Sequence, residues 1–228
     1  MGTLYLVRHG QASLGADNYD QLSHLGLRQS VRLGEYFART GLKFSTVMTG
    51  TLQRHAQTWA GIEQGMGVTA SSATAIRAIA KPSLNEYDSH ALVNSVQSTA
   101  HTQPKGAADV MAYFRLLREG LSQWMQGAIQ PEGMPSYSAF ASGITDVLDK
   151  LRQHHDGHVL IVSSGGPISI AVGHILGATP EARIALNLQI RNSAVTELRL
   201  THKHHSLVTF NTLPHLDPVD HAEWVTYA

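Results

Sequence analysis

Apolar and polar residues alternate along this chain in two distinct ways. Short, nearly continuous apolar runs predict strands over residues 3–8, 45–48, 75–79, 159–163, 195–200 and 206–212. Apolar residues that recur every three or four positions predict helices over about 24–39, 52–64, 109–126 and 137–154. Strands that alternate with helices favour a mostly parallel sheet with helices on both faces. We therefore expect an α/β fold, a three-layer αβα sandwich.

Local signals place the ends of several elements. Ser23 is a candidate N-cap for the first helix, and Pro167 is suited to the first position of the helix that follows strand 159–163. The last two strands are expected at one edge of the sheet. No Pro/Gly/Ser-rich linker, charge block or repeat divides the sequence, so residues 1–228 are interpreted as a single domain with a helical excursion over the site at about 89–135.

The composition excludes several classes of protein. The 228 residues hold 17 Lys and Arg against 17 Asp and Glu, so the chain lacks the basic surface of a protein that binds nucleic acid or anionic membranes. There is no cysteine, which rules out a disulfide framework, a thiol nucleophile and a cysteine-ligated metal centre. The N-terminus does not resemble a signal peptide, and a Ser/Gly/Pro turn interrupts the apolar stretch 159–178. These features predict a cytoplasmic protein.

Candidate chemistry lies at the ends of the predicted strands. The first strand delivers Arg8-His9-Gly10-Gln11 onto a loop, and Arg54 follows the second strand. Glu86 lies in a later loop, and Ser163-Ser164-Gly165-Gly166-Pro167 forms a turn at a helix N-terminus, where free N–H groups favour an anion. In open α/β sheets, ligands bind beyond the carboxyl ends of the strands. Guanidinium groups match phosphate oxygens and a neutral imidazole can attack phosphorus, so this set predicts a phosphomonoester site.

The same segments resemble the histidine phosphatase superfamily, in its phosphoglycerate mutase-like branch 1. The shared motifs are the Arg-His-Gly strand end, Leu52-x-Arg54-x-x-Gln57-Thr58, Leu84-Asn85-Glu86, Val162-Ser163-x-Gly165-Gly166 and Asn192-Ser193-Ala194-Val195-Thr196. The resemblance covers nearly the whole chain and implies a phosphoglycerate mutase-like fold.

The resemblance also implies a mechanism for the predicted site. His9 would accept the phosphoryl group, Arg8 and Arg54 would hold its oxygens, and Glu86 would donate a proton to the leaving oxygen. Because the arginines supply the positive charge, no metal or other cofactor is expected. The chain is therefore interpreted as a metal-independent enzyme of the histidine acid-phosphatase type, which hydrolyses phosphomonoesters through a phosphohistidine intermediate.

One departure from the family bears on activity. Family members carry a second histidine in a Val-Ser-His-Gly-Gly turn, where this chain has Ser164. A serine hydroxyl can donate a hydrogen bond to the phosphoryl group but supplies no positive charge, so activity is expected to be reduced. Replacing Ser164 by histidine is expected to raise it. His55 and His90 are candidates for compensation, although nothing in the sequence places either near the site.

The first loop also differs from the family pattern. Ala12 stands where a phosphate-contacting residue is expected, so Ser13 and Asn18 can substitute only if the loop shifts in register. Gln11 matches the pattern and is assigned to the phosphate pocket, together with Gly165 in the helix-terminal turn.

Two other functions stay open from the sequence. A phosphoglycerate-type mutase would return the phosphoryl group to its substrate, but residues 87–92 match the mutase pattern poorly. A weakly active or non-catalytic member would bind phosphate or a phosphoprotein. The expected partner is a small phosphorylated substrate or a phosphopeptide, with no nucleic acid and no membrane, and the late edge strands offer a surface for a homodimer. The tract 202–205 resembles metal ligands, but a solvated hairpin explains it better.

Overall fold

A mixed sheet forms the centre of the molecule in the computed structural model, which describes residues 2–13, 20–68, 76–96, 107–154, 156–201 and 203–227. Its strands are β1 (Gly2–Arg8), β2 (Thr46–Thr49), β3 (Ile79–Ala80), β4 (Gly157–Ser163), β5 (Val195–Leu200) and β6 (His205–Thr212). They lie in the order β3-β2-β4-β1-β5-β6. The strands β1 to β4 pair in parallel, whereas β5 runs antiparallel to β1 and β6 antiparallel to β5. The prediction of a mostly parallel sheet is confirmed, with the late strands at one edge.

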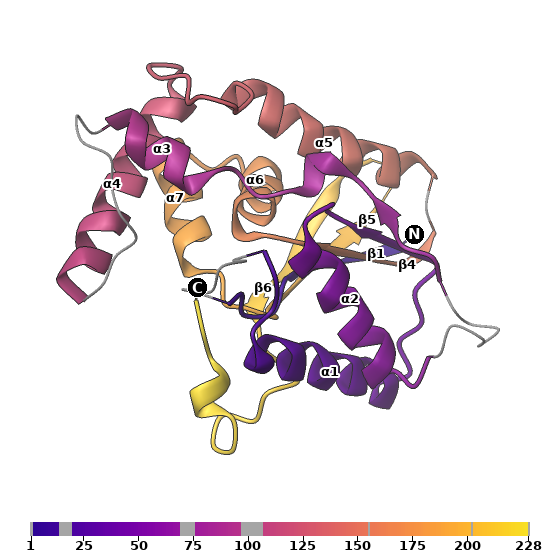
Figure 1. Ribbon diagram of the computed structural model, residues 1–228. Coiled ribbons are helices and arrows are strands. Elements are labelled where there is room, and N and C mark those ends of the chain that lie inside the picture. The colour runs from indigo at the N-terminus through magenta and orange to yellow at the C-terminus, as the bar shows by residue number, and fades with distance from the viewer. Residues whose placement is uncertain are drawn as a thin grey trace.

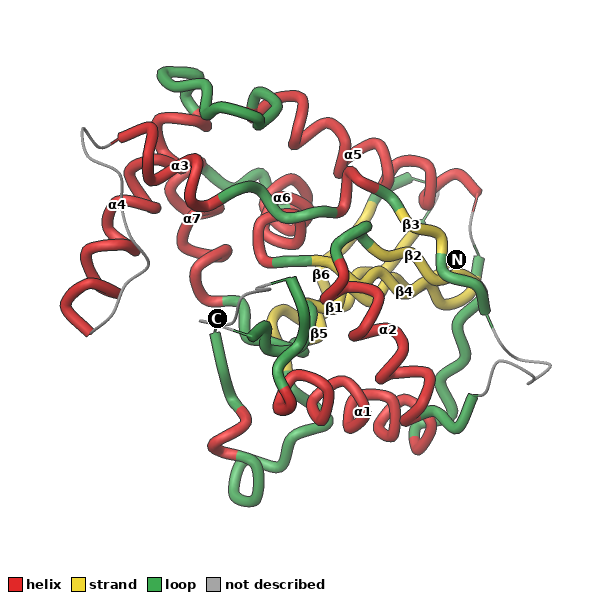
Figure 2. Tube along the Cα trace, in the orientation of Figure 1, coloured by secondary structure: helices red, strands yellow, loops and turns green. Residues whose placement is uncertain are grey.

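Helices cover both faces of this sheet (Figure 1). They are α1 (His24–Arg39), α2 (Gln53–Gly65), α3 (Ser89–Val96), α4 (Ala107–Met125), α5 (Tyr137–His154), α6 (Gly165–Ile175) and α7 (Pro180–Gln189). Figure 2 shows α1 and α2 on one face, and α5 and α6 on the other. The three-layer αβα arrangement agrees with the prediction.

Side chains along β1 and β4 point alternately to the two faces of the sheet and contribute to a separate apolar core on each face. Leu6 and Ile161 pack against α5 and α6 on one face. Val7 and Val162, each the next residue in its strand, pack against α1 and α2 on the other face. Because successive strand residues point to opposite faces, strands buried on both sides read as continuous apolar runs. This is why the sequence pattern identified both strands.

A third apolar cluster joins α3, α4 and α7 (Figure 1). Its buried side chains are Leu92, Val93, Leu117, Leu121, Trp124 and Ile184. The indole Nε1–H of Trp124 donates to the carbonyl oxygen of Pro135 at 3.1 Å. The described parts of the segment 89–135 therefore include α3 and α4, which pack together with α7.

Two helix starts differ from the sequence-based expectation. The helix after β4 begins at Gly165 with Ser164 as its N-cap, so Pro167 occupies the third helical position and not the first. Its missing N–H still costs no helical hydrogen bond, because the first four N–H groups of a helix have no intrahelical acceptor. A proline at the first position is found in α7, where Pro180 follows the N-cap Thr179. The sequence pattern did not predict this helix.

The other element ends lie closer to those predicted. Ser23 is the N-cap of α1, and its Oγ accepts a hydrogen bond from the Gly26 N–H at 3.0 Å, as expected. Strand β3 has only two residues, and the predicted start at residue 75 lies outside the described residues. No helix in the described ranges is long and apolar enough to cross a membrane.

Candidate active site

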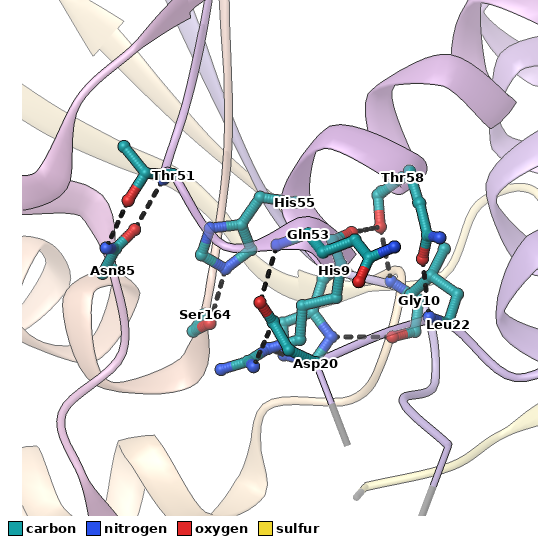
Figure 3. A network of polar contacts seen from close by, with 12 residues as sticks. His9, Gly10, Asp20, Leu22, Thr51, Gln53, His55, Thr58, Asn85 and Ser164 are labelled. Atoms are coloured by element: carbon teal, nitrogen blue, oxygen red, sulfur yellow. Dashed lines mark hydrogen bonds and ion pairs between the residues drawn. The ribbon is translucent and has the colours of Figure 1, made fainter. Parts of the chain in front are cut away.

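The carboxyl ends of neighbouring parallel strands bring His9 and Ser164 close together (Figure 3). Strand β1 ends at Arg8, which pairs with Ser163 at the end of β4, and β2 ends beside them. Loops that follow parallel strands meet at the same edge of a sheet. As a result His9, Arg54 and Ser164 lie close together, although they are far apart in the sequence.

His9 is buried and its ring has a fixed orientation. Nδ1 lies 2.7 Å from the carbonyl oxygen of Gly10. A carbonyl only accepts, so Nδ1 carries the hydrogen and Nε2 bears the lone pair. The Arg54 Nε–H donates to that Nε2 at 3.2 Å. Burial, together with the charges of Arg8 and Arg54, lowers the pKa of His9 well below its usual value, which keeps the ring neutral.

The backbone of His9 is held from both neighbouring strands. Its N–H donates to the Ser163 carbonyl oxygen at 2.9 Å, and its own carbonyl oxygen accepts from the Ser193 N–H at 3.2 Å and from Asn192 Nδ2 at 3.3 Å. The Asn192 N–H donates in turn to the Thr226 carbonyl oxygen at 2.8 Å. The Asn-Ser motif therefore supports His9 and also ties the C-terminal segment to the site.

Arg54 is held by a carboxylate that the sequence did not predict. Its Nη1 donates to Asp20 Oδ1 at 2.8 Å, and the other Asp20 oxygen accepts from the Gln53 N–H at 2.8 Å. Asp20 therefore caps α2, whose own N-cap Leu52 offers no side-chain acceptor. An acidic residue in the first loop and an uncapped helix start were the only signals for this contact in the sequence.

The Gln57-Thr58 pair of the sequence motif fastens the first loop to α2. Gln57 Oε1 accepts from the Leu22 N–H at 2.7 Å, and Thr58 Oγ1 accepts from the Gly10 N–H at 3.1 Å. A Cβ at Gly10 would overlap the carbonyl oxygen of Gly26 in α1, so this close approach requires glycine. The motif thus positions the backbone next to His9.

Glu86 faces the start of α6. Its two carboxylate oxygens lie 3.1 and 3.2 Å from the Gly166 nitrogen, which donates to them, and a Cβ on Gly166 would overlap Oε1. Burial raises the pKa of Glu86, and this outweighs the lowering by the Gly166 hydrogen bond and by the charges of Arg8 and Arg54. Glu86 therefore holds a proton at a pH where an ordinary glutamate is ionised.

Arg8 contributes charge to the site while its side chain binds backbone. Nη1 donates to the carbonyl oxygens of Ile190 and of Tyr227, the latter at 2.7 Å. Its positive charge lowers the pKa of both His9 and Glu86. The structure therefore places Arg8 within electrostatic reach of both groups.

His55 is the histidine that the structure brings to Ser164. Its Nε2 lies 2.7 Å from Ser164 Oγ, and its ring centroid lies 5.7 Å from that of His9. Burial lowers the pKa of His55 to about 3, so the imidazole is neutral and supplies no positive charge. The other candidate, His90, is exposed and packs its ring against Tyr113 of α4.

Of the remaining predicted site residues, Gln11 and Ser13 make their hydrogen bonds away from His9. Gln11 Oε1 accepts from the N-cap hydroxyl of α1 at 2.8 Å, and the Ser13 N–H donates to the Gln21 carbonyl oxygen at 2.8 Å. Neither Gln11 nor Ser13 joins the hydrogen bonds around His9 within the part of the chain that the structure describes. Gly165 is the buried first residue of α6. Asn18 lies outside the described residues.

Among the described residues, no group of three or more His, Asp or Glu side chains lies close enough to hold a metal ion. His202 of the histidine-rich tract lies outside them, and His205 begins the edge strand β6.

A comparison with protein families identifies the group to which this sequence is related. The model of the histidine phosphatase superfamily (branch 1) matches residues 4–213. The chain belongs to this superfamily. The resemblance inferred from the strand-end motifs is confirmed over nearly the whole chain. No curated protein matches the sequence of this superfamily member.

Solved structures of phosphatases share the fold. Phosphoserine phosphatase from Entamoeba histolytica, in complex with 3-phosphoglyceric acid, is 19% identical over 95% of this chain and 100% of its own, with a TM-score of 0.65. Mycobacterial glucosyl-3-phosphoglycerate phosphatase with inorganic phosphate is 18% identical over 94% and 99%, with a TM-score of 0.66. A putative alpha-ribazole-5'-P phosphatase from Escherichia coli is 20% identical over 92% and 96%, with a TM-score of 0.65.

Proposed function

We propose that this protein is a phosphatase that hydrolyses small phosphomonoesters without a metal ion, with His9 as the nucleophile. The orientation of the His9 ring carries the proposal. Its Nδ1–H is bound to the Gly10 carbonyl oxygen, so the lone pair of Nε2 faces Arg54. When a phosphoryl group binds, its oxygens would take over the Arg54 Nε–H from Nε2, which frees the lone pair to face phosphorus. Membership of the superfamily and the phosphatases among the structural neighbours support the same conclusion.

In the first chemical step, His9 Nε2 attacks phosphorus and forms a P–N bond while the P–O bond to the alcohol breaks. The departing oxygen takes a proton from Glu86, whose raised pKa keeps it protonated beforehand. The equatorial oxygens carry the developing charge. The positive charges of Arg8 and Arg54 stabilise that charge.

In the second step, water cleaves the P–N bond. The Glu86 carboxylate, ionised by the first step, accepts a proton from the attacking water. Inorganic phosphate forms, and His9 returns to its neutral state with the lone pair on Nε2. The neutral Ser164 in this site supplies no charge, which is consistent with a reduced turnover relative to a site with two histidines.

We infer that the substrate is a small phosphorylated organic acid or a related phosphomonoester. The neighbouring structures include complexes with 3-phosphoglyceric acid and with inorganic phosphate. In this chain, the carbonyl oxygen of Tyr227 lies on Arg8, and Glu86 packs on the start of α6. The C-terminal segment and the Glu86 loop therefore border the space around His9, which favours a small substrate over a phosphopeptide.

The test uses purified full-length protein with p-nitrophenyl phosphate and 3-phosphoglycerate. Wild type is expected to release inorganic phosphate, and acid quenching is expected to trap acid-labile, base-stable phosphate on the protein. His9→Ala is expected to abolish both. His24→Ala, which removes an exposed histidine at the start of α1, is the matched control and should behave as wild type.

Two other results would contradict the proposed phosphatase activity. Absence of turnover and of trapped phosphate in the wild type, with binding of inorganic phosphate retained, would make the protein a binding module. Isomerised phosphoglycerate without phosphate release would make it a mutase.

A further inference from the structure

Ser164 and His55 form a buried pair between the starts of α2 and α6 (Figure 3). Ser164 is the N-cap of α6, but its hydroxyl does not cap that helix. Instead Oγ lies 2.7 Å from His55 Nε2, and neither residue is exposed. Serine at a helix start ordinarily accepts from an N–H of its own helix. The contact with His55 therefore gives this hydroxyl a different role.

The surroundings of the His55 ring indicate which nitrogen carries the hydrogen. Nδ1 has no hydrogen-bond partner among the described residues. It lies against Gly50, where a Cβ would overlap it. Buried N–H groups without an acceptor are rarer than buried acceptors without a donor. The hydrogen is therefore assigned to Nε2, which donates to Ser164 Oγ, and Ser164 keeps its own O–H for another acceptor.

The two neighbours of the Ser164 hydroxyl, Ser163 and His55, place it next to His9. The carbonyl oxygen of Ser163, the preceding residue, accepts the His9 N–H, and the His55 ring lies 5.7 Å from the His9 ring. We propose that the Ser164 hydroxyl donates a hydrogen bond to the phosphoryl group bound at His9, and that His55 is the positioning residue that orients this hydroxyl. The inference rests on the proposed function and assigns a task to a pair that the reaction scheme leaves unused.

The pair supplies a donor without a charge. Because the pKa of His55 is lowered to about 3, the ring stays neutral at neutral pH. The positive charge around the phosphoryl group is left to Arg8 and Arg54. Because His55 fixes the Ser164 hydroxyl, this donor can be aligned before the reaction begins. A hydroxyl that rotates freely would not be aligned in this way.

The pair also changes the expectation for Ser164→His. The sequence alone suggested that this substitution raises activity. In the structure, His55 is already in hydrogen-bond contact with position 164, so an imidazole placed there would collide with the His55 ring. The single substitution is therefore expected to lower activity. Adding His55→Ala removes that ring, so the double variant is expected to be more active than Ser164→His alone.

A double-mutant cycle tests whether His55 acts through Ser164. The variants are Ser164→Ala, His55→Leu and both together, measured for turnover of p-nitrophenyl phosphate and for affinity toward orthovanadate by calorimetry. Ser164→Ala is expected to lower kcat and the orthovanadate affinity by about 10- to 100-fold, with a smaller change in KM. His55→Leu should give a loss of similar size, and the double variant should lose no more than Ser164→Ala alone.

Two further variants separate positioning from folding. His55→Gln places an amide N–H near the position of Nε2 and should recover most of the loss. His158→Leu is the control, because His158 packs its ring against Tyr5 at the start of β4, the end of that strand far from His9. It should lower thermal stability as His55→Leu does while it leaves the kcat of the folded protein near that of the wild type.

The outcomes distinguish this inference from the proposed function. Losses that do not add in the double variant, with recovery in His55→Gln, support the pair. Additive losses, or an unchanged kcat in Ser164→Ala, overturn it even when the wild type is active. If the wild type shows neither turnover nor phosphohistidine, the proposed function fails, and the cycle on orthovanadate affinity decides the inference separately by the same criteria.

Discussion

The two helix N-termini beside His9 are both capped by a carboxylate from another segment, but the two carboxylates differ in their second partner. Helices α2 and α6 both follow a parallel strand, and neither is capped by the side chain of its own N-cap residue. Each is capped instead by a carboxylate from another segment: Asp20 accepts from the Gln53 N–H in α2, and Glu86 accepts from the Gly166 N–H in α6. A carboxylate at a helix N-terminus is favourable in both places.

The difference lies in the second partner of each carboxylate. Asp20 also accepts from the guanidinium of Arg54 at 2.8 Å and is partly exposed. Glu86 has the Gly166 N–H as its helix-terminal partner, and burial raises its pKa. The ion-paired carboxylate of Asp20 holds a cation, whereas the pKa of the Glu86 carboxyl is raised, which favours its protonated form. The same local geometry therefore serves positioning in α2 and, in the mechanism we propose, proton transfer in α6.

The largest expected effect comes from Glu86→Gln. For an alkyl phosphomonoester, kcat should fall by about 10²–10⁴-fold, since a positioned proton donor contributes this much. For p-nitrophenyl phosphate the loss should be much smaller, because nitrophenolate leaves without a proton. The variant should also lose the alkaline fall in kcat/KM that ionisation of Glu86 causes. Asp20→Asn is the matched control, and an equal leaving-group dependence there would contradict the distinction between the two carboxylates.

A smaller effect is expected when Glu86 is displaced but kept. In Gly166→Ala, the new Cβ would overlap Glu86 Oε1 and lie 2.7 Å from the Tyr87 ring. Misplacement of a reacting group by about 1 Å costs about 10²-fold in rate, so kcat should fall by about 10- to 100-fold. Gly165→Ala is the control. Its Cβ would lie 2.7 Å from the end of the Asn187 side chain, a group that can move away, so kcat should fall less. Equal losses would show that the effect is not specific to Glu86.

The link between the two helices should be visible in the pH dependence of stability. His55 lies in α2 and binds the N-cap of α6, with its pKa lowered from 6.5 to about 3. The unfolded chain therefore binds one proton more below pH 6.5, and stability falls as the pH falls toward 3. His55→Leu should reduce the slope of the unfolding free energy between pH 4 and 6 by about 1.4 kcal/mol per pH unit. Urea unfolding at several pH values measures it, and an unchanged slope would mean that His55 is protonated in the folded state.

The smallest effect is expected for the cap of α2. Asp20→Ala removes the acceptor of the Gln53 N–H and should lower the unfolding free energy by about 1 kcal/mol, with little added by the partly exposed ion pair to Arg54. Ser23→Ala, which removes the cap that α1 makes with its own side chain, provides the benchmark. Urea unfolding of both variants at neutral pH tests this. A loss several-fold larger for Asp20→Ala would show that its ion pair with Arg54 dominates.

Local sequence patterns were sufficient for the strands and for part of the site. The runs that end at Arg8 and Ser163 are buried on both faces, so they carry a continuous apolar pattern. The polar residues that follow such runs lie by geometry at the carboxyl edge of the sheet. This is why His9, Arg54 and the α6 turn could be placed near one another before the structure was known.

The contacts that refine the site could not be predicted in this way. Asp20 lies 34 positions from Arg54, and His55 lies 109 positions from Ser164. No periodicity connects such residues, because their contact depends on how the strands are ordered in the sheet. The start of α6 was misplaced for a related reason: Pro167 is compatible with any of the first helical positions, and the backbone of Ser164 determines which one it takes.

The bond from Arg8 to the Tyr227 carbonyl oxygen has a practical consequence for anyone who prepares this protein. An affinity tag fused after Tyr227 would continue the segment that binds Arg8, so it is expected to disturb the proposed phosphate site. The N-terminal end of β1 lies at the far end of the same strand from Arg8 (Figure 1), a separation of about 20 Å for a strand of this length. Recombinant material intended for enzymology is best tagged there.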